Sequence, residues 1–213
     1  MSDHDAIDVN GFPYKILIAT RNIGKVREIR ALLQGLQTAL LTLEDFSEAP
    51  EVLEDGATFE ENALKKARVM ARATGVTVLA EDSGLCVDAL DGRPGVHSAR
   101  YAGEGATDAD KCIRILEELT RVPDSRRTAR FVCVLAIVSP DGDERIFRGV
   151  CDGRITHELR GTFGFGYDPI FYHEESGCTF AEMDQERKNQ VSHRGKALRE
   201  FAAFAQSRAG TRE

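Results

Sequence analysis

The residues that could do chemistry fall into four short segments, and the first joins an apolar run to an amphipathic one. It consists of Thr20, Arg21, Asn22, Ile23, Gly24 and Lys25. Backbone N–H groups at a helix N-terminus attract phosphate, and the helix dipole adds to that attraction. Lys25 contributes a full charge, and Gly24 lets the backbone approach closely. The spacing is not that of a Walker A loop. The segment predicts a phosphate site; the alternative is a capped helix start with a solvated lysine.

The second segment is acidic and centres on Asp82, which follows a predicted buried strand. A carboxylate at the carboxyl end of an α/β strand faces the crevice in which ligands bind. Mg²⁺ is commonly held by one or two carboxylates together with substrate phosphates. We therefore expect Asp82, with Glu54 or Glu61, to hold Mg²⁺. The alternatives are a turn-forming role for Asp82 and a helix-dipole role for Glu61.

The third segment, residues 161–169, alternates glycines with aromatic residues. Its central residues are Phe165, Gly166, Tyr167 and Asp168. Glycines thin the backbone and aromatic rings offer flat faces, which together suit a slot for a purine ring. Asp168 could accept a hydrogen bond from a base N–H. The alternative is a structural loop whose aromatic side chains enter the core.

The fourth segment is basic and holds Lys188, Ser192, His193 and Arg194. His193 and Arg194 fall at a predicted helix start, where the dipole disfavours cations. Residues placed against a local preference in this way indicate a functional site. The alternative is a solvated basic patch. Together the four segments supply an anion cradle, metal carboxylates, a flat slot and cationic groups. That set predicts a protein that binds or hydrolyses nucleotides.

Alternating strands and helices position these segments. The predicted strands are 15–20, 38–43 and 76–81, followed by a long hairpin over 127–155. Four helices are predicted: one that follows Lys25, one over 58–74, one that begins at Thr107 or Asp108, and one over 193–205. This order predicts an α/β fold with a mixed sheet, in two lobes around a cleft. No linker is visible, so we expect a flexible tail over 1–13 and one two-lobed domain over 14–206.

Composition argues against several classes of partner and location. The 213 residues carry 28 Lys and Arg against 35 Asp and Glu, a formal charge of -7, which argues against duplex nucleic acid as a partner. No apolar run reaches the roughly 18 residues of a membrane helix. The five cysteines show no disulfide or zinc spacing, so we expect a reducing cytoplasm.

Five segments in order resemble the inosine/xanthosine triphosphate pyrophosphatase family. They are ATRNIGKVREIRALL, EDGATFEENALKKA, LAEDSGLCVDALDGRPGVHSARYAG, GTFGFGYDPIF and SHRGKAL. The resemblance implies an elongated, twisted mixed sheet with flanking helices and two lobes around a nucleotide cleft. It also implies a homodimer, and a reaction in which water attacks the α-phosphorus of ITP, dITP or XTP to release pyrophosphate.

The resemblance also assigns roles to residues. Thr20 to Lys25 match the family's phosphate-binding turn, Asp82 its catalytic base and metal ligand, and Ser83 a substrate contact. Phe165 to Asp168 match the base pocket. Lys188, His193 and Arg194 match the remaining nucleotide contacts. Two positions depart from the family pattern: Arg21 replaces a small residue, and Glu81 stands where aspartate is usual.

Two other functions remain open from the sequence. One is a pyrophosphatase for modified pyrimidine or 7-methylguanosine triphosphates, which the first segment alone would permit. The other is a nucleotide sensor without catalysis, against which Asp82 and Glu54 argue because a sensor needs no metal carboxylates.

Overall fold

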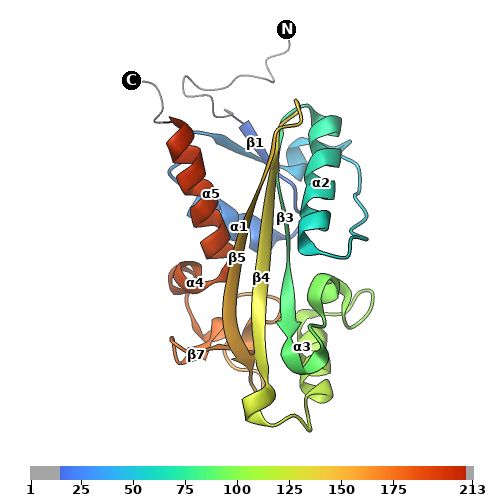
Figure 1. The fold of residues 1–213 in the computed structure, drawn as a ribbon, viewed down its shortest axis with the longest axis vertical. Helices are drawn as coiled ribbons and strands as arrows, with labels where there is room; N and C mark the ends of the chain where they lie inside the picture. The colour runs from blue at the N-terminus through green and yellow to red at the C-terminus, as the bar shows by residue number, and fades with distance from the viewer. Residues whose placement is uncertain (1–14, 210–213) are drawn as a thin grey trace. The chain divides into compact units, whose positions relative to one another are not determined.

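The computed structural model describes residues 15–209, and it confirms an α/β fold with a mixed sheet (Figure 1). The expected tail over 1–13 lies outside the described residues. The seven strands lie in the order β2-β1-β3-β4-β5-β6-β7. Their bounds are β1 Lys15–Ile18, β2 Ala39–Thr42, β3 Thr77–Val87, β4 Thr128–Val138, β5 Glu144–Ile155, β6 Phe171–His173 and β7 Cys178–Thr179. The α-helices are α1 Ile23–Leu32, α2 Phe59–Thr74, α3 Asp108–Glu118, α4 Gln185–Val191 and α5 His193–Ala209.

Local signals set the bounds of α2. Thr58 caps its first turn by accepting the Glu61 N–H at 3.1 Å, which satisfies one of the helix's orphan donors. Gly75 ends it in the left-handed conformation, with φ of 68°, where a residue without Cβ is favoured. The carboxylate of Glu61 accepts the Ala57 N–H at 2.7 Å, so Glu61 helps to fix the chain that enters the helix.

Strand β3 is longer than the sequence predicts, and this corrects the position of Asp82. The pairing of β1 with β3 is parallel and runs from Ile16 opposite Thr77 to Ile18 opposite Leu79. Beyond Leu79 the chain stays extended to Val87, because β4 continues to pair with it. Asp82 therefore lies in mid-strand rather than at a strand's end, although it lies beyond the carboxyl end of β1.

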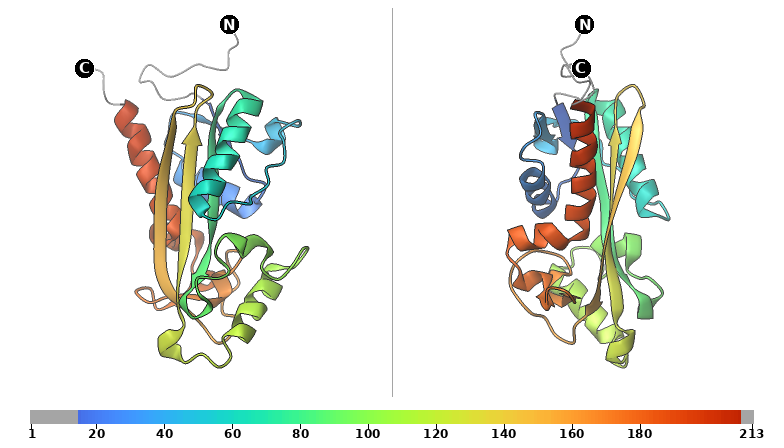
Figure 2. Two further views of the ribbon diagram at one scale, coloured as in Figure 1. Left: turned by 45° about the vertical axis from the view of Figure 1, so that its right-hand side comes forward. Right: turned by 60° about the vertical axis from the view of Figure 1, so that its left-hand side comes forward.

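Strands β4 and β5 form the predicted long hairpin. Its turn is closed by bonds from the Ser139 N–H to the Asp143 carbonyl at 2.9 Å and from the Gly142 N–H to the Ser139 carbonyl at 3.0 Å. Residues 132–138 of β4 are buried one after another, which requires cover on both faces of the strand. Figure 2 shows that cover as α2 and α5, which lie on opposite sides of these strands.

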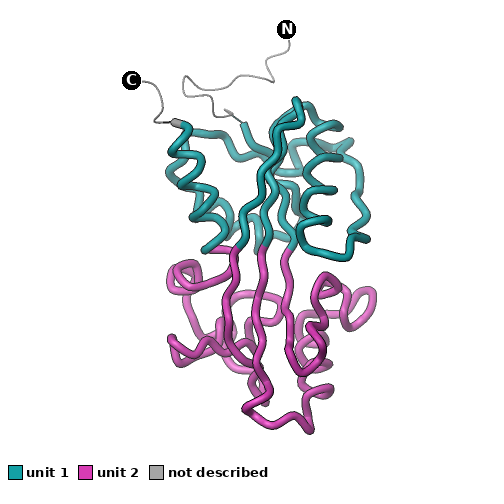
Figure 3. Tube along the Cα trace, viewed as in Figure 1, with its two compact units in different colours: residues 1–82, 134–148, 196–213 teal, residues 83–133, 149–195 magenta. Residues whose placement is uncertain are grey.

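The described chain divides into two compact units (Figure 3). Unit 1 comprises residues 15–82, 134–148 and 196–209, and unit 2 comprises 83–133 and 149–195. The boundary falls between Asp82 and Ser83. An apolar cluster of unit 2 joins α3, through Cys112 and Ile115, to Phe171. The expectation of one two-lobed domain over 14–206 stays a prediction. Among residues 15–209, no helix is long and apolar enough to cross a membrane.

Candidate active site

The segment from Thr20 to Lys25 builds a capped helix start in unit 1. The Asn22 side chain accepts the Lys25 N–H at 3.1 Å, and the Thr20 hydroxyl accepts the Asn22 N–H at 3.2 Å. The structural alternative is thus realised for Asn22. Arg21 and Ile23 are exposed. Gly24 lies in the first helical turn, whose N–H groups carry the positive end of the dipole, so the cap and an anion site are compatible here.

Two lysines lie among three carboxylates in unit 1. The Lys25 ammonium contacts the Glu81 carboxylate at 3.2 Å, and that carboxylate is buried. The Lys66 ammonium pairs with the Glu54 carboxylate and donates to the backbone carbonyl of Glu81 at 3.0 Å. Glu81, the departure from the family pattern, therefore holds the predicted phosphate-binding lysine.

Asp82, the third carboxylate, is buried like Glu81, with 5% of its surface exposed. Burial raises its pKa above the ordinary value, and the charge of Glu54 raises it further, while a hydrogen bond from Asn62 and the charges of Lys25 and Lys66 lower it. A carboxyl whose pKa lies nearer to neutrality is a better general base, so the environment of Asp82 favours proton transfer.

Asn62 orients Asp82, and the sequence did not single it out. Its amide nitrogen donates to the Asp82 carboxylate at 3.0 Å, and its amide oxygen accepts the Gly56 N–H at 2.8 Å. Asn62 is 1% exposed. A Cβ at Gly56 would lie 2.7 Å from that amide oxygen, so only glycine allows the approach. An asparagine on the mainly apolar, buried face of a helix is the signal that could have revealed it.

Within the described chain, no group of three or more His, Cys, Asp or Glu side chains is arranged to hold a metal ion. Two carboxylates nevertheless suit a hard cation that takes most of its ligands from phosphates and water. The charge of Glu54 raises the pKa of Asp82, and a divalent cation would relieve that repulsion. Glu61 stays an alternative to Glu54, because the Ala57 N–H is bonded to one of its two carboxylate oxygens.

In unit 2, the predicted base pocket is built on a buried ion pair. The Lys188 ammonium donates to the Asp168 carboxylate at 2.5 Å, and each side chain is 3% exposed. The same carboxylate oxygen accepts the Phe165 N–H at 2.9 Å. A Cβ at Gly164 would lie 2.0 Å from it. Asp168 thus fixes the glycine-aromatic loop to α4.

Two cations face the ring of Phe165. The Lys188 nitrogen lies 4.8 Å from the ring centroid and the guanidinium carbon of Arg194 lies 5.4 Å from it. Arg194 also donates to the Ser83 hydroxyl at 3.2 Å, and it is 2% exposed. The His193 ring stacks on Phe131 at 4.6 Å. The basic segment is therefore buried, not a solvated patch.

Tyr167 belongs to the core and not to an open slot. Its hydroxyl donates to the Ser98 carbonyl at 2.8 Å, and its ring lies in the apolar cluster of unit 2. Burial raises the pKa of this hydroxyl, so it stays a hydrogen-bond donor. Gly166 is held by its N–H, which donates to the Asp108 carboxylate at 2.6 Å. The side-chain contacts of Tyr167 are those of the structural alternative, and its place in the base pocket stays a prediction.

The predicted residues thus form two sets. Unit 1 contains the helix start, Asp82 and Glu54, to which the structure adds Asn62 and Lys66. Unit 2 contains the other predicted residues, which are Ser83, Phe165, Gly166, Tyr167, Asp168, Lys188, His193 and Arg194.

Replacing Asn62 with alanine is expected to lower kcat by roughly tenfold or more, because misplaced catalytic groups lose rate steeply. It should also raise the pKa of Asp82 further in the metal-free protein, since a donor to the charged form is lost. Steady-state kinetics and NMR titration of the Asp82 carboxyl measure both effects. A loss of kcat with an unmoved Asp82 titration would show that Asn62 acts only through the fold.

Comparison with known proteins identifies the family of the chain. The model of the Ham1 family matches residues 16–204. A dITP/XTP pyrophosphatase of Geobacter sulfurreducens is 57% identical over 184 residues, which are 86% of this chain and 92% of that protein. One from Geobacillus kaustophilus is 52% identical over 184 residues, 86% of this chain and 90% of that protein.

Solved structures show the same fold. A HAM1 protein from Coxiella burnetii is 43% identical with a TM-score of 0.84, over 91% of this chain and 98% of that one. The Staphylococcus aureus Ham1 protein is 38% identical with a TM-score of 0.82, over 91% of this chain and 98% of that one. The resemblance inferred from the five segments is confirmed, and the chain belongs to the Ham1 family.

Proposed function

We propose that the protein hydrolyses non-canonical purine nucleoside triphosphates, namely dITP, ITP and XTP, to the monophosphate and pyrophosphate. The observation that carries this proposal is the 57% identity, over 86% of the chain, to a dITP/XTP pyrophosphatase. The buried carboxylate of Asp82, with its raised pKa, supports it from the structure. A nucleotide sensor would have no use for such a group.

In this proposal, residues of unit 1 act on the triphosphate. Glu54 and Asp82 would hold Mg²⁺, which supplies positive charge that neutralises the phosphates and makes a bound water more acidic. Asp82 accepts the proton of the attacking water on its carboxylate, while Asn62 keeps that carboxylate in position. Lys25 donates to a phosphate oxygen while it keeps its contact with Glu81, because an ammonium group carries three N–H donors.

Residues of unit 2 select the base. Hypoxanthine and xanthine present an acceptor at the 6-position and a donor at N1, and adenine reverses both. A buried guanidinium such as Arg194 donates and never accepts. Facing the 6-oxo group it is satisfied, whereas the amino group of adenine would leave buried donors unpaired. Mispairing of this kind can give discrimination of about 10⁴.

Replacing Arg194 with alanine should therefore reduce the ratio of kcat/KM for ITP over ATP by about tenfold or more, because the penalty on adenine is removed. Arg194→Lys, which keeps a positive charge without the planar donor fork, should retain part of the preference. Initial rates with both nucleotides measure the ratio. An unchanged ratio in Arg194→Ala would exclude Arg194 from base recognition.

A substrate panel tests the function itself. We expect release of pyrophosphate from dITP, ITP and XTP that needs added Mg²⁺ and far exceeds release from the four standard triphosphates. A preference for modified pyrimidine or 7-methylguanosine triphosphates would favour the other pyrophosphatase activity. Absence of Mg²⁺-dependent turnover on every triphosphate would favour the sensor.

Three further features belong to the proposal. We propose that the protein works as a homodimer, as the resemblance implies, and in the cytoplasm, where the thiols of its five free cysteines stay reduced. Burial raises the pKa of Cys112 to about 12, which keeps that thiol protonated and inert. We also propose that residues 14–206 fold as one domain.

A further inference from the structure

A second basic site lies in unit 2, in a pocket of about 190 Å³ that none of the residues assigned above lines. Three arginines line it, Arg127, Arg154 and Arg160, together with one histidine and one carboxylate, His157 and Asp124. Three guanidiniums around one small pocket repel one another unless negative charge is nearby. The groups that balance each of the three charges therefore decide whether the pocket can take an anion.

Arg127 is the buried arginine of the pocket, and it is 2% exposed. Its guanidinium donates to the backbone carbonyls of Leu119 at 2.8 Å, Ile155 at 2.9 Å and Thr156 at 2.6 Å. Those bonds use three of the five N–H groups that a guanidinium carries. Among residues 15–208, no carboxylate lies within ion-pair distance of it. A buried cation whose hydrogen bonds go to neutral carbonyls is costly. The charge of Asp124 offsets part of that cost, and a bound anion would offset more of it.

The other two arginines are exposed and loosely paired. Arg154 contacts the Glu174 carboxylate at 3.0 Å, and Arg160 contacts the Glu158 carboxylate at 3.0 Å. The two arginine side chains are 43% and 46% exposed, and both glutamates are more exposed still. Exposed pairs of this kind contribute about 0–1 kcal/mol, so both guanidiniums can turn to a ligand. His157, which contacts Asp124 at 2.5 Å, can do the same.

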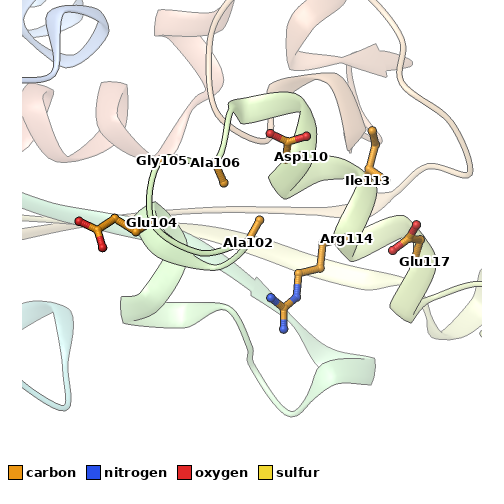
Figure 4. A pocket seen from close by; sticks show the side chains of 8 residues that line it. All are labelled: Ala102, Glu104, Gly105, Ala106, Asp110, Ile113, Arg114 and Glu117. Atoms are coloured by element: carbon orange, nitrogen blue, oxygen red, sulfur yellow. The ribbon is translucent and has the colours of Figure 1, made fainter.

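The larger groove of unit 2, of about 580 Å³, has the opposite character (Figure 4). It runs along α3 and carries three carboxylates, those of Glu104, Asp110 and Glu117, against the one guanidinium of Arg114. That groove would repel a phosphate. The excess of guanidinium groups therefore distinguishes the Arg127 pocket from this larger groove.

We propose that the Arg127 pocket binds a phosphate-type oxyanion, with Arg127 as its buried anchor and Arg154 and Arg160 as mobile clamps. Planar guanidiniums bind phosphate oxygens in pairs, which makes arginine the residue suited to this ligand. A volume of about 190 Å³ equals that of about six water molecules, which accommodates one phosphate. Free inorganic phosphate and the terminal group of pyrophosphate share this chemistry.

The test uses inorganic phosphate and pyrophosphate as probes of the full chain at fixed ionic strength. Backbone amide shifts of residues 154–157 report occupancy of the pocket in NMR titrations. The variant is Arg154→Gln/Arg160→Gln. The matched control is Arg130→Gln, which removes an arginine of unit 2 that is 45% exposed and paired with Asp88 at 3.1 Å.

We expect phosphate to shift the amides of residues 154–157 in the native protein and in Arg130→Gln. The double variant should bind phosphate in the Arg127 pocket at least about tenfold more weakly, since charge-assisted hydrogen bonds are lost. Its hydrolysis of dITP should be unchanged, because neither arginine belongs to the proposed active site. Absence of shifts at 154–157 with both probes, or equal affinity in the double variant and the control, would overturn the proposal.

Discussion

Asp82→Asn is expected to lower kcat for dITP by about 10³-fold, because general base catalysis contributes roughly 10²–10⁴ in rate. The structure predicts that this loss is not caused by unfolding. The amide has the shape of the carboxyl group, and its oxygen can still accept from Asn62, as the carboxylate does at 3.0 Å. Steady-state kinetics at saturating substrate and Mg²⁺ measure the effect.

The stability of the metal-free fold should not fall in Asp82→Asn. Burial raises the pKa of Asp82 in the folded chain, so at neutral pH the ionised group destabilises the metal-free fold, and a neutral amide removes that cost. We expect an unchanged or higher Tm for the metal-free variant. Asp55→Asn is the control, because Asp55 is an exposed carboxylate paired with Lys65. Near-normal kcat in Asp82→Asn would remove Asp82 from the mechanism.

Lys188→Met is expected to cost about 3–5 kcal/mol of folding free energy, because it leaves the buried carboxylate of Asp168 without its counter-ion. The two groups lie 2.5 Å apart with each side chain 3% exposed. The double variant Lys188→Met/Asp168→Asn should recover part of that loss, since no unpaired charge remains. Urea denaturation of the three proteins measures the coupling.

The chain contains a matched control for this prediction. Lys65 and Asp55 are also 2.5 Å apart, but their side chains are 41% and 57% exposed. Lys65→Met should cost at most about 1 kcal/mol, because solvent screens an exposed pair. The two pairs have the same length and differ in burial. Equal losses in Lys188→Met and Lys65→Met would contradict the account of the loop as fixed by a buried charge.

The elements that the sequence predicted well are those with signals inside the element. Helix α2 has its cap at Thr58, its apolar stripe and its end at Gly75 within one stretch. The hairpin of β4 and β5 has a turn with Pro140 and Gly142. Strand β3 was predicted too short because its second half is extended by pairing with β4, a partner that begins some forty residues later in the chain.

The sequence singles out candidate residues one by one but not the contacts between them. Asp168 and Lys188 were each assigned to the nucleotide, yet in the structure they bind one another across 20 residues of chain. Tyr167 was assigned to the base slot, and in the structure its hydroxyl donates to the carbonyl of Ser98, which lies 69 residues earlier in the chain. The sequence analysis did not single out Asn62. Local pattern predicts which residues matter, whereas the partner of a buried polar group depends on packing.

The place of bond cleavage tests the central claim most directly. Hydrolysis of dITP in ¹⁸O-labelled water, followed by mass spectrometry of both products, shows which phosphorus the water attacks. We predict one labelled oxygen in the deoxyinosine monophosphate and none in the pyrophosphate, since Asp82 is proposed to activate water toward the α-phosphorus. Label in the pyrophosphate, or formation of the diphosphate and inorganic phosphate, would contradict the account.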